Sequence, residues 1–290
     1  MSTDSLATDG RVRRQSWQDV LPDDLFVHVA LVASTLVMAL PLLLALLMST
    51  QTTTQIYQTS NLTPGGQAVH NYVAAMTEYG MGRYLLNSLV MSLVIVVGKV
   101  TISLFAALAI VYYRFRFKRL VFMFILFTLM LPVPVRILSL FQFVANIGWS
   151  DSLLALTAPY LASATTVFLL RQHFRSIPDS LIETARLDGI GPLTFLFRVL
   201  VPMSKGMIAG VAVIEFIYAW NQYLWPLTIM STQRKQVAQV GVKLLQSASA
   251  AGQTQWGLIM AGAVIALVPP LLVLLVLHRP LLQTFGLQQK

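Results

Sequence analysis

Long apolar stretches separated by short polar segments dominate the pattern along the chain. A helix needs about 20 apolar residues to cross the hydrocarbon core of a bilayer, and six stretches meet that length. They cover approximately Leu25–Met48, Tyr84–Tyr113, Leu120–Phe141, Leu153–Phe174, Met207–Met230 and Gly257–His278. The third stretch is interrupted by Pro132 and Pro134. Because lipid cannot satisfy backbone polar groups, the pattern predicts an all-α membrane protein with six transmembrane helices.

The composition supports lipid as the natural solvent of this chain. Of its 290 residues, 56% are hydrophobic and only 11% are charged, and the mean hydropathy is +0.71. A soluble domain carries about a quarter charged residues. The net charge of +9 would suit a nucleic-acid-binding protein. The cationic residues, however, lie in short clusters between apolar runs and not along one polar face, which argues against that class. Cysteine is absent and the four histidines are scattered, so we expect neither disulfides nor a metal site.

The distribution of Lys and Arg between the loops predicts the orientation. One set of segments holds Arg11, Arg13, Arg14, Arg114, Arg116, Lys118, Arg119, Arg171, Arg175, Arg186, Arg198, Lys205, Arg279 and Lys290. The opposite set holds only Arg83, Arg136, Arg234, Lys235 and Lys243. The richer side is expected in the cytoplasm, together with both termini. The expected organisation is a cytoplasmic segment 1–24, a six-span domain 25–278 and a cytoplasmic tail 279–290.

A cationic cluster, Arg114 to Arg119, follows the second apolar stretch. Its position predicts a stop-transfer anchor in the first place and a contact to lipid headgroups in the second.

The cytoplasmic segment 176–205 is too long for a simple connector. Ser176 is a plausible helix cap, Pro178 opens an amphipathic helix and Gly189 ends it. The expected apolar positions of this helix are Leu181, Ile182, Ala185 and Leu187. A second short helix is expected at about Pro192–Leu200. Two short helices joined at a glycine form a surface to which another protein can bind.

This segment carries a recognisable motif. Residues 183–189 read Glu-Thr-Ala-Arg-Leu-Asp-Gly, and after nine further residues 199–202 read Val-Leu-Val-Pro. The spacing resembles the EAA loop of ABC importer permeases, with Thr184 in place of the second alanine. The runs 129–136 and 220–227 are similar to the maltose-type carbohydrate branch of that family, and within it to permeases of sn-glycerol-3-phosphate importers.

The resemblance implies a six-span permease with a cytoplasmic coupling loop in the bacterial inner membrane. A second permease subunit would complete the pore, an ATPase homodimer would drive it, and a periplasmic or lipid-anchored binding protein would deliver substrate. The chain would not be an enzyme, since ATP and Mg would be bound by the ATPase. In agreement, Gly98-Lys99-Val100 lacks the Ser or Thr and the upstream glycine of a P-loop.

In this family the EAA helices fit a cleft on the ATPase and transmit its closure to the membrane. The residues implied in coupling are Glu183, Ala185, Asp188, Gly189 and Pro202. We expect Glu183 to make a polar contact with the ATPase, Ala185 to keep the contact face shallow, and Gly189 to permit the turn.

Ionisable and amide side chains within the spans are candidates for the substrate path, because burying such groups in lipid is costly. The candidates are Lys99, Arg136, Glu215, Asn221, Gln222, Tyr223 and Trp225. Lys99 and Glu215 could pair with each other, line the pore or reach the interface. Arg136 could bind a phosphate through two hydrogen bonds or anchor the helix at the interface. The amides and aromatic residues could bind a polyol, form an interfacial belt or contact the second permease.

The outer segment between the last two spans contains small residues that could enter the cleft of a binding protein. The candidates are Ser249, Ala250, Gly252 and Gln253. A plain flexible loop is the alternative interpretation.

The sequence favours sn-glycerol 3-phosphate or related glycerophosphodiesters as the substrate, with an oligosaccharide as the alternative. An ion-coupled secondary transporter is a rival of a different class. That rival predicts internal repeats with interrupted spans in matching positions. No such repeat is evident, and the EAA spacing has no purpose without an ATPase partner.

Overall fold

Every element formed by the described part of the chain is a helix, which confirms the all-α prediction. The computed structural model describes residues 22–58, 62–247 and 253–284. The chain divides into two compact units, Met1–Leu46 and Leu47–Lys290. With 3-10 and π turns labelled η, the elements are α1 (Pro22–Met48), α2 (Thr53–Tyr57), α3 (Ala68–Val73), η1 (Ala74–Glu78), α4 (Met81–Tyr112), α5 (Lys118–Phe127), η2 (Thr128–Met130), α6 (Val133–Asn146), α7 (Leu153–Thr157), η3 (Ala158–Tyr160), α8 (Ala164–Arg175), α9 (Asp179–Leu187), α10 (Pro192–Phe195), η4 (Leu196–Leu200), α11 (Val201–Met203), α12 (Lys205–Trp220), α13 (Leu224–Ile229), η5 (Gln233–Lys235), α14 (Ala238–Ser247) and α15 (Trp256–Thr284).

The described part of the first unit is α1 as far as Leu46. Its stretch Leu25–Met48 has a mean hydropathy of 2.5 and is long enough to cross a membrane. Apolar side chains such as Phe26, Val37 and Met38 are 71–81% exposed. A helix that is apolar on all sides requires an apolar solvent.

The second unit contains two straight candidate spans and three bent ones. Met81–Tyr112 and Trp256–His278 are each long and apolar enough alone. Three helix pairs qualify only together, and they are Lys118–Met130 with Pro134–Asn146 (bent by 103°), Leu153–Tyr160 with Ala164–Arg175 (43°), and Pro192–Met203 with Lys205–Trp220 (83°). Including α1, the described residues therefore hold three straight candidate spans, or up to six if each bent pair counts as one.

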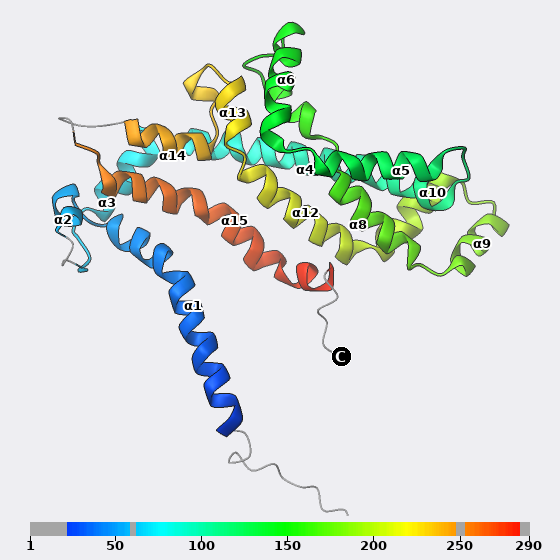
Figure 1. The fold of residues 1–290 in the computed structure, drawn as a ribbon, viewed down its shortest axis with the longest axis horizontal. Coiled ribbons are helices and arrows are strands. Elements are labelled where there is room, and N and C mark those ends of the chain that lie inside the picture. The colour runs from blue at the N-terminus through cyan, green and yellow to red at the C-terminus, as the bar shows by residue number, and fades with distance from the viewer. Residues whose placement is uncertain (1–21, 59–61, 248–252, 285–290) are drawn as a thin grey trace, which may run out of the picture. The chain divides into compact units, whose positions relative to one another are not determined.

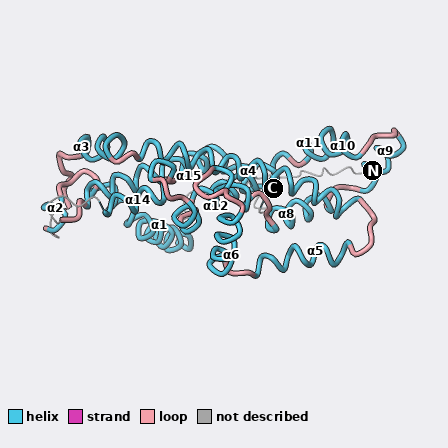
Figure 2. Tube along the Cα trace, turned by 90° about the horizontal axis from the view of Figure 1, so that it is seen from above, coloured by secondary structure: helices cyan, strands magenta, loops and turns pink. Residues whose placement is uncertain are grey.

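The proline interruption expected in the third span is present. Leu131 is extended (φ −77°, ψ 119°), and Pro132 is the extended N-cap of α6. A residue that precedes proline is disfavoured in the helical conformation, so α5 and η2 stop before Pro132. Figure 2 shows α6 turning sharply away from the line of α5.

The fifth span differs from its expected range of Met207–Met230. Helix α12 ends at Trp220, and a separate short helix, α13, begins at Leu224. Pro226 lies in the first turn of α13, where its missing N–H is tolerated. In a continuous helix the same proline would clash with the carbonyl group one turn earlier, so the chain breaks before it.

Helix α4 is the element against which much of the second unit packs. It lies along α8, α12 and α14 (Figure 1). Glycines permit the close approach, because a Cβ atom on Gly241 would overlap the ring of Tyr84, and one on Gly98 would overlap the side chain of Leu161. Small residues at such crossings are typical of helices packed within membranes.

The two ends of the second unit are built from different parts of the chain. Helices α9 and α10 lie at one end, whereas α3 and α14 lie at the other (Figures 1 and 2). The segments that the sequence placed on opposite sides of the membrane therefore occupy opposite ends of this unit.

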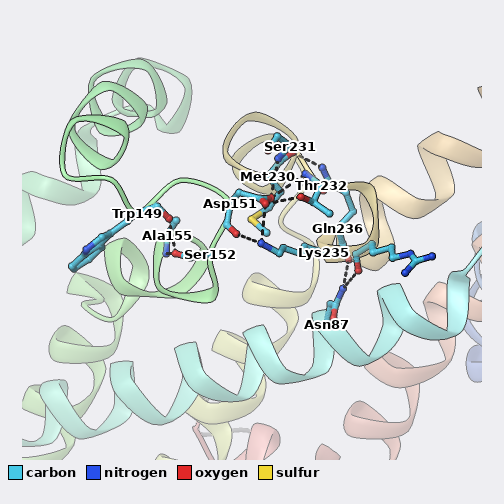
Figure 3. A network of polar contacts seen from close by, with 11 residues as sticks. Asn87, Trp149, Asp151, Ser152, Ala155, Met230, Ser231, Thr232, Lys235 and Gln236 are labelled. Carbon is cyan, nitrogen blue, oxygen red and sulfur yellow. Dashed lines mark hydrogen bonds and ion pairs between the residues drawn. The ribbon is translucent and has the colours of Figure 1, made fainter.

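A polar clamp holds the turn before α7 against the turn after α13 (Figure 3). Asp151, in a left-handed conformation (φ 58°), accepts hydrogen bonds from the backbone N–H groups of Ser231 and Thr232 at 3.2 and 3.0 Å. Its other carboxylate oxygen accepts the hydroxyl of Thr232 at 2.6 Å and lies 2.8 Å from Lys235 Nζ. Beside this clamp, the side-chain amide of Asn87 donates to the carbonyl groups of Arg234 and Gln236. These contacts fix α4, α7 and the turn after α13 to one another.

The clamp depends on the charge of Asp151. Hydrogen bonds from Lys235 and Thr232 hold the pKa of this carboxyl well below its ordinary value of 3.8. A depressed pKa means that the stabilisation is fully present above the ordinary value and is lost as the pH falls toward the pKa of the folded state.

We expect Asp151→Asn to lower the melting temperature of the detergent-solubilised protein at neutral pH, because the amide loses the charged contacts. The difference from wild type should narrow below about pH 4, because the carboxyl of Asp151 then begins to be protonated in the unfolded state while it is still charged in the folded state. Thermal unfolding of both proteins from neutral pH down to about pH 3 measures this. Asp188→Asn, which removes an exposed carboxylate without a described partner, is the matched control. A difference that stays constant across the pH range would contradict the charge-based explanation.

Candidate functional site

A buried ion pair joins three of the helices that line the middle of the second unit. Lys99 Nζ, from α4, lies 2.6 Å from Glu215 Oε2, from α12, and both side chains are 5% exposed. The other carboxylate oxygen accepts hydrogen bonds from Ser163 and Thr166, each at 2.6 Å, at the start of α8. The Lys99 ammonium also lies 4.3 Å from the ring centroid of Tyr218. One carboxylate therefore ties α4, α8 and α12 together.

A cavity of about 800 Å³, here called the charged cavity, opens beside this pair. Its lining residues come from α4, from η2 and α6, from the η3–α8 break and from α12. Three of them are charged at neutral pH: Lys99, Arg136 and Glu215. Lys99 and Glu215 neutralise each other. Arg136 is exposed, and no hydrogen bond or ion pair joins its side chain to another residue in the described ranges. The cavity therefore presents one unpaired guanidinium.

A second cavity of about 560 Å³, the amide cavity, adjoins the first. It is lined by Ile137, Tyr160, Ile214, Ile217, Tyr218, Asn221, Gln222, Tyr223, Leu224 and Trp225. Ile137, Tyr160, Ile214 and Tyr218 line both cavities and mark the junction. Each of the seven residues suggested by the sequence for the substrate path borders one cavity or the other.

These residues are not equally free to meet a ligand. Both polar atoms of the Gln222 side chain are buried without a hydrogen-bond partner in the described part of the chain. The side-chain oxygen of Asn221 accepts a hydrogen bond from the side-chain amide of Gln239 at 3.2 Å. Trp225 is 1% exposed, and its indole N–H donates to the carbonyl of Ala155 at 3.0 Å. Trp225 is thus a core residue at the cavity wall, and Gln222 is the amide without a described hydrogen-bond partner.

Three interruptions of the helices, two of them within bent pairs and one after α12, coincide with these cavities. Leu131 precedes the α6 break, Ser163 precedes α8, and Asn221 follows α12, and each borders a cavity. Irregular backbone at membrane depth is tolerated where it lines a cavity, because its polar groups then need not face lipid.

Sequence reasoning missed four residues at this site: Tyr160, Ser163, Thr166 and Tyr218. Two signals were present in the chain. Tyr218 lies three positions after Glu215 on α12, so the two share a helix face. Ser163 and Thr166 form an N-cap pair at the start of α8, where hydroxyl groups can also meet a carboxylate.

The coupling segment exposes a different face from the one expected. Glu183 and Asp188 are exposed, and Leu187 is 88% exposed although the sequence assigned it to the apolar face. Ala185, expected to keep the ATPase contact face shallow, is instead 7% exposed and packs inward against residues of α4, α8 and α10. Its small size lets α9 approach the rest of its own chain.

The ends of α9 also correct one assignment. Ser176 donates its hydroxyl to the carbonyl of His173 at 2.7 Å and lies at the C-cap of α8, so it does not cap α9. Gly189 has φ 66°, the left-handed conformation typical of a glycine that ends a helix.

The second coupling helix continues past its expected end at Leu200. A π turn over Leu196–Leu200 leads directly into α11, in which Pro202 lies in the first turn. Pro202 has no amide hydrogen to donate. A proline within a helix is tolerated where a local π turn adjusts the backbone hydrogen bonds around it.

Of the candidates for a binding-protein contact, Ser249, Ala250 and Gly252 lie outside the described residues, and Gln253 is exposed. Within the ranges that the structure describes, no three His, Asp or Glu side chains are close enough to hold a metal ion.

We expect Glu215→Gln to destabilise the protein by about 3–5 kcal/mol, because it leaves the Lys99 ammonium buried without a counter-charge. The double variant Lys99→Met/Glu215→Gln should recover most of that loss, since no buried charge remains. Thermal unfolding in a mild detergent measures both. A single variant as stable as wild type would show that water reaches Lys99.

Comparison with known proteins assigns the chain to a family. Residues 99–284 match the family described as binding-protein-dependent transport system inner membrane component. The sn-glycerol-3-phosphate transport system permease protein UgpE of Pectobacterium atrosepticum is 42% identical over 263 residues, which cover 88% of this chain and 93% of that protein. The protein of the same name from Yersinia enterocolitica is 41% identical over 264 residues, with the same coverage.

A solved structure has the same fold. It is a bacterial ABC transporter involved in the import of the acidic polysaccharide alginate, with a TM-score of 0.79, 21% sequence identity, and coverage of 91% of this chain and 97% of that one. At this identity the likeness concerns the fold alone. A permease of this kind is a transport subunit of the inner membrane and not an enzyme, and its importer includes a second permease, an ATPase and a binding protein. The chain belongs to the family of binding-protein-dependent transport system inner membrane components, the permease subunits of ABC importers.

Proposed function

We propose that this chain forms half of the translocation pore for sn-glycerol 3-phosphate or related glycerophosphodiesters. The observation that carries the substrate class is the charge of the cavities. Arg136 is the one lining cation without a described counter-charge, and the adjoining amide cavity has no ionisable acid or base in its lining other than tyrosine. The names of the UgpE relatives support the same substrate.

The two cavities suit the two halves of such a molecule. A guanidinium can donate two parallel hydrogen bonds to a phosphate, which supplies both charge and orientation. The unpartnered amide of Gln222 and the Tyr223 side chain can serve the hydroxyl groups of glycerol. A substrate that bridges the cavities would pass the junction formed by Tyr160 and Tyr218.

A neutral oligosaccharide is the second candidate, and one observation favours it. Tyr160, Tyr218 and Tyr223 all border the amide cavity, where aromatic faces can pack against sugar rings. A neutral oligosaccharide would leave Arg136 without an anionic partner, so the oligosaccharide is the weaker candidate.

Energy would reach the pore through α9. The proposed docking surface for an ATPase homodimer is the exposed side of α9 and its end, with Glu183, Leu187 and Asp188. ATP and Mg would be held by that partner. Both termini, including segments 1–24 and 279–290, would lie in the cytoplasm, and the region of Gln253 would meet a periplasmic or lipid-anchored binding protein.

We expect Arg136→Gln to raise the glycerol 3-phosphate concentration needed for half-maximal ATPase stimulation by about 10- to 100-fold. This corresponds to losing a charged hydrogen bond of about 1.5–3 kcal/mol. The measurement uses the complete importer in lipid nanodiscs with its binding protein, and compares glycerol 3-phosphate with maltooligosaccharides. Arg234→Gln is the matched control, because that exposed arginine lines a different cavity.

Stimulation by maltooligosaccharides alone would agree with an ABC importer but contradict glycerol 3-phosphate as its substrate. An equal loss in Arg136→Gln and Arg234→Gln would assign the effect to general surface charge.

We expect Glu183→Lys to reduce co-purification of the ATPase at least tenfold, because the reversed charge would face the site that Glu183 binds. Leu187→Ser should weaken the same association by removing an apolar contact. The control is Glu78→Lys, the same reversal on an exposed residue of η1, which directly follows α3 at the opposite end of the unit (Figure 1). Quantifying the ATPase retained on the tagged permease tests this. Full retention in both α9 variants would show that the ATPase docks elsewhere.

A further inference from the structure

A cationic cavity lies at the shared end of α4, α5 and α8, apart from the substrate cavities and from the exposed face of α9. It has a volume of about 470 Å³ and is lined by Ile110, Val111, Tyr112, Lys118, Arg171, Phe174, Arg175 and Ile177. Three of these eight side chains are cationic and none is acidic. The cavity lies where two candidate spans end, at Tyr112 and at Arg175.

Lys118 is held firmly in this cavity. Its ammonium donates to the carbonyl oxygens of Val111 at 3.0 Å and Tyr113 at 3.1 Å, at the end of α4. These are carbonyl groups that a helix end leaves without intrahelical partners, so the ammonium caps α4. The turn that brings Lys118 there passes through Phe117, whose φ of 66° is unusual for an aromatic residue. An ammonium has three donors, and two are used.

Arg171 is positioned by stacking and retains an unsatisfied donor. Its guanidinium carbon lies 4.0 Å from the ring centroid of Phe122, on α5. One terminal nitrogen donates to the Gln172 side chain at 3.3 Å. Its Nε is buried and has no hydrogen-bond partner in the described ranges. A buried N–H without an acceptor is rare and calls for an explanation.

No described carboxylate balances the three charges. The ion pairs formed within the described residues involve Glu215 and Asp151, neither of which lines this cavity. Arg175 is exposed, and its side chain makes no hydrogen bond with another described residue. Three cations held around one cavity repel one another unless an anion joins them.

The surroundings indicate where that anion comes from. Helix α5 begins at Lys118, and its side chains Leu120, Phe124 and Phe127 are 58–69% exposed. A strongly apolar exposed surface that starts one turn from the cations suits acyl chains, whereas the cavity suits the headgroup. Guanidinium groups favour phosphate because their planar N–H groups match two of its oxygens.

We infer that Lys118, Arg171 and Arg175 form a phosphate-binding site at the membrane surface, occupied by the headgroup of an anionic phospholipid lying along α5. This site is independent of the proposed substrate. It joins the ends of α4 and α8 to α5 through a bound lipid.

The test is native mass spectrometry of the full-length chain, with any subunits that co-purify, equilibrated with equal amounts of phosphatidylglycerol and phosphatidylcholine. We expect wild type to retain phosphatidylglycerol preferentially, and Arg171→Gln/Arg175→Gln to retain about tenfold less, as expected when charged hydrogen bonds are lost. The matched control is Arg116→Gln/Arg119→Gln, which removes the same charge from residues next to Lys118 in the sequence without touching the cavity lining. Arg171→Lys/Arg175→Lys keeps the charge and should give an intermediate result.

A second arm distinguishes the sources of the phosphate group. The melting temperature of delipidated protein is measured with inorganic phosphate and with phosphatidylglycerol in separate samples. A rise with the lipid alone supports the lipid-headgroup site, whereas an equal rise with inorganic phosphate would keep the phosphate site and overturn the lipid occupant.

Three results would overturn the site itself. One is equal retention of the two lipids together with no effect of phosphate. Another is an equal loss in the control double variant, which would assign the preference to general surface charge. The third is unchanged lipid retention with loss of the ATPase from Arg171→Gln/Arg175→Gln, which would place the cavity in a protein interface.

Discussion

The buried Lys99–Glu215 pair is the constraint around which the middle of this protein is organised. A charge at membrane depth is tolerated only when it is paired and hydrogen-bonded. Glu215 meets this condition by accepting from Lys99, Ser163 and Thr166, and so it holds α4, α8 and α12 in one arrangement. The same pairing cancels the two charges and leaves Arg136 to determine the sign of the adjoining cavity. One interaction therefore both joins the three helices and affects the charge of the cavity.

The interrupted helices follow from the same physical rule. Backbone that leaves a helix within a membrane needs polar surroundings, and the breaks at Leu131, Ser163 and Asn221 find them at the two cavities. The breaks in turn bring amide and hydroxyl groups to the cavity wall. Gln222, with both polar side-chain atoms buried and unpartnered, is the clearest product of this arrangement.

Helix α4 connects the two ends of the second unit. This helix extends from the cluster that contains Tyr84 at one end of the unit to the cluster that contains Leu108 at the other, and the second cluster includes Ala185 of α9. Because Ala185 packs inward, α9 shares an apolar cluster with the ends of α4 and α8. The Asp151 clamp stabilises the opposite end of the same helix through the turn that contains Lys235.

Local properties of the sequence determined much of this protein. The apolar stretches specified lipid as the solvent and an all-α fold, Pro132 marked the break before α6, and Gly189 marked the end of α9. The EAA spacing identified the family. Tertiary structure alone decided that Lys99 meets Glu215 across 116 positions, that Tyr160 and Tyr218 share a junction, that Ala185 faces inward and that Arg171 joins Lys118. The physical reason is that a helix surrounded by lipid can be apolar on every side. Its sequence then carries no amphipathic signal to show which face packs against which neighbour.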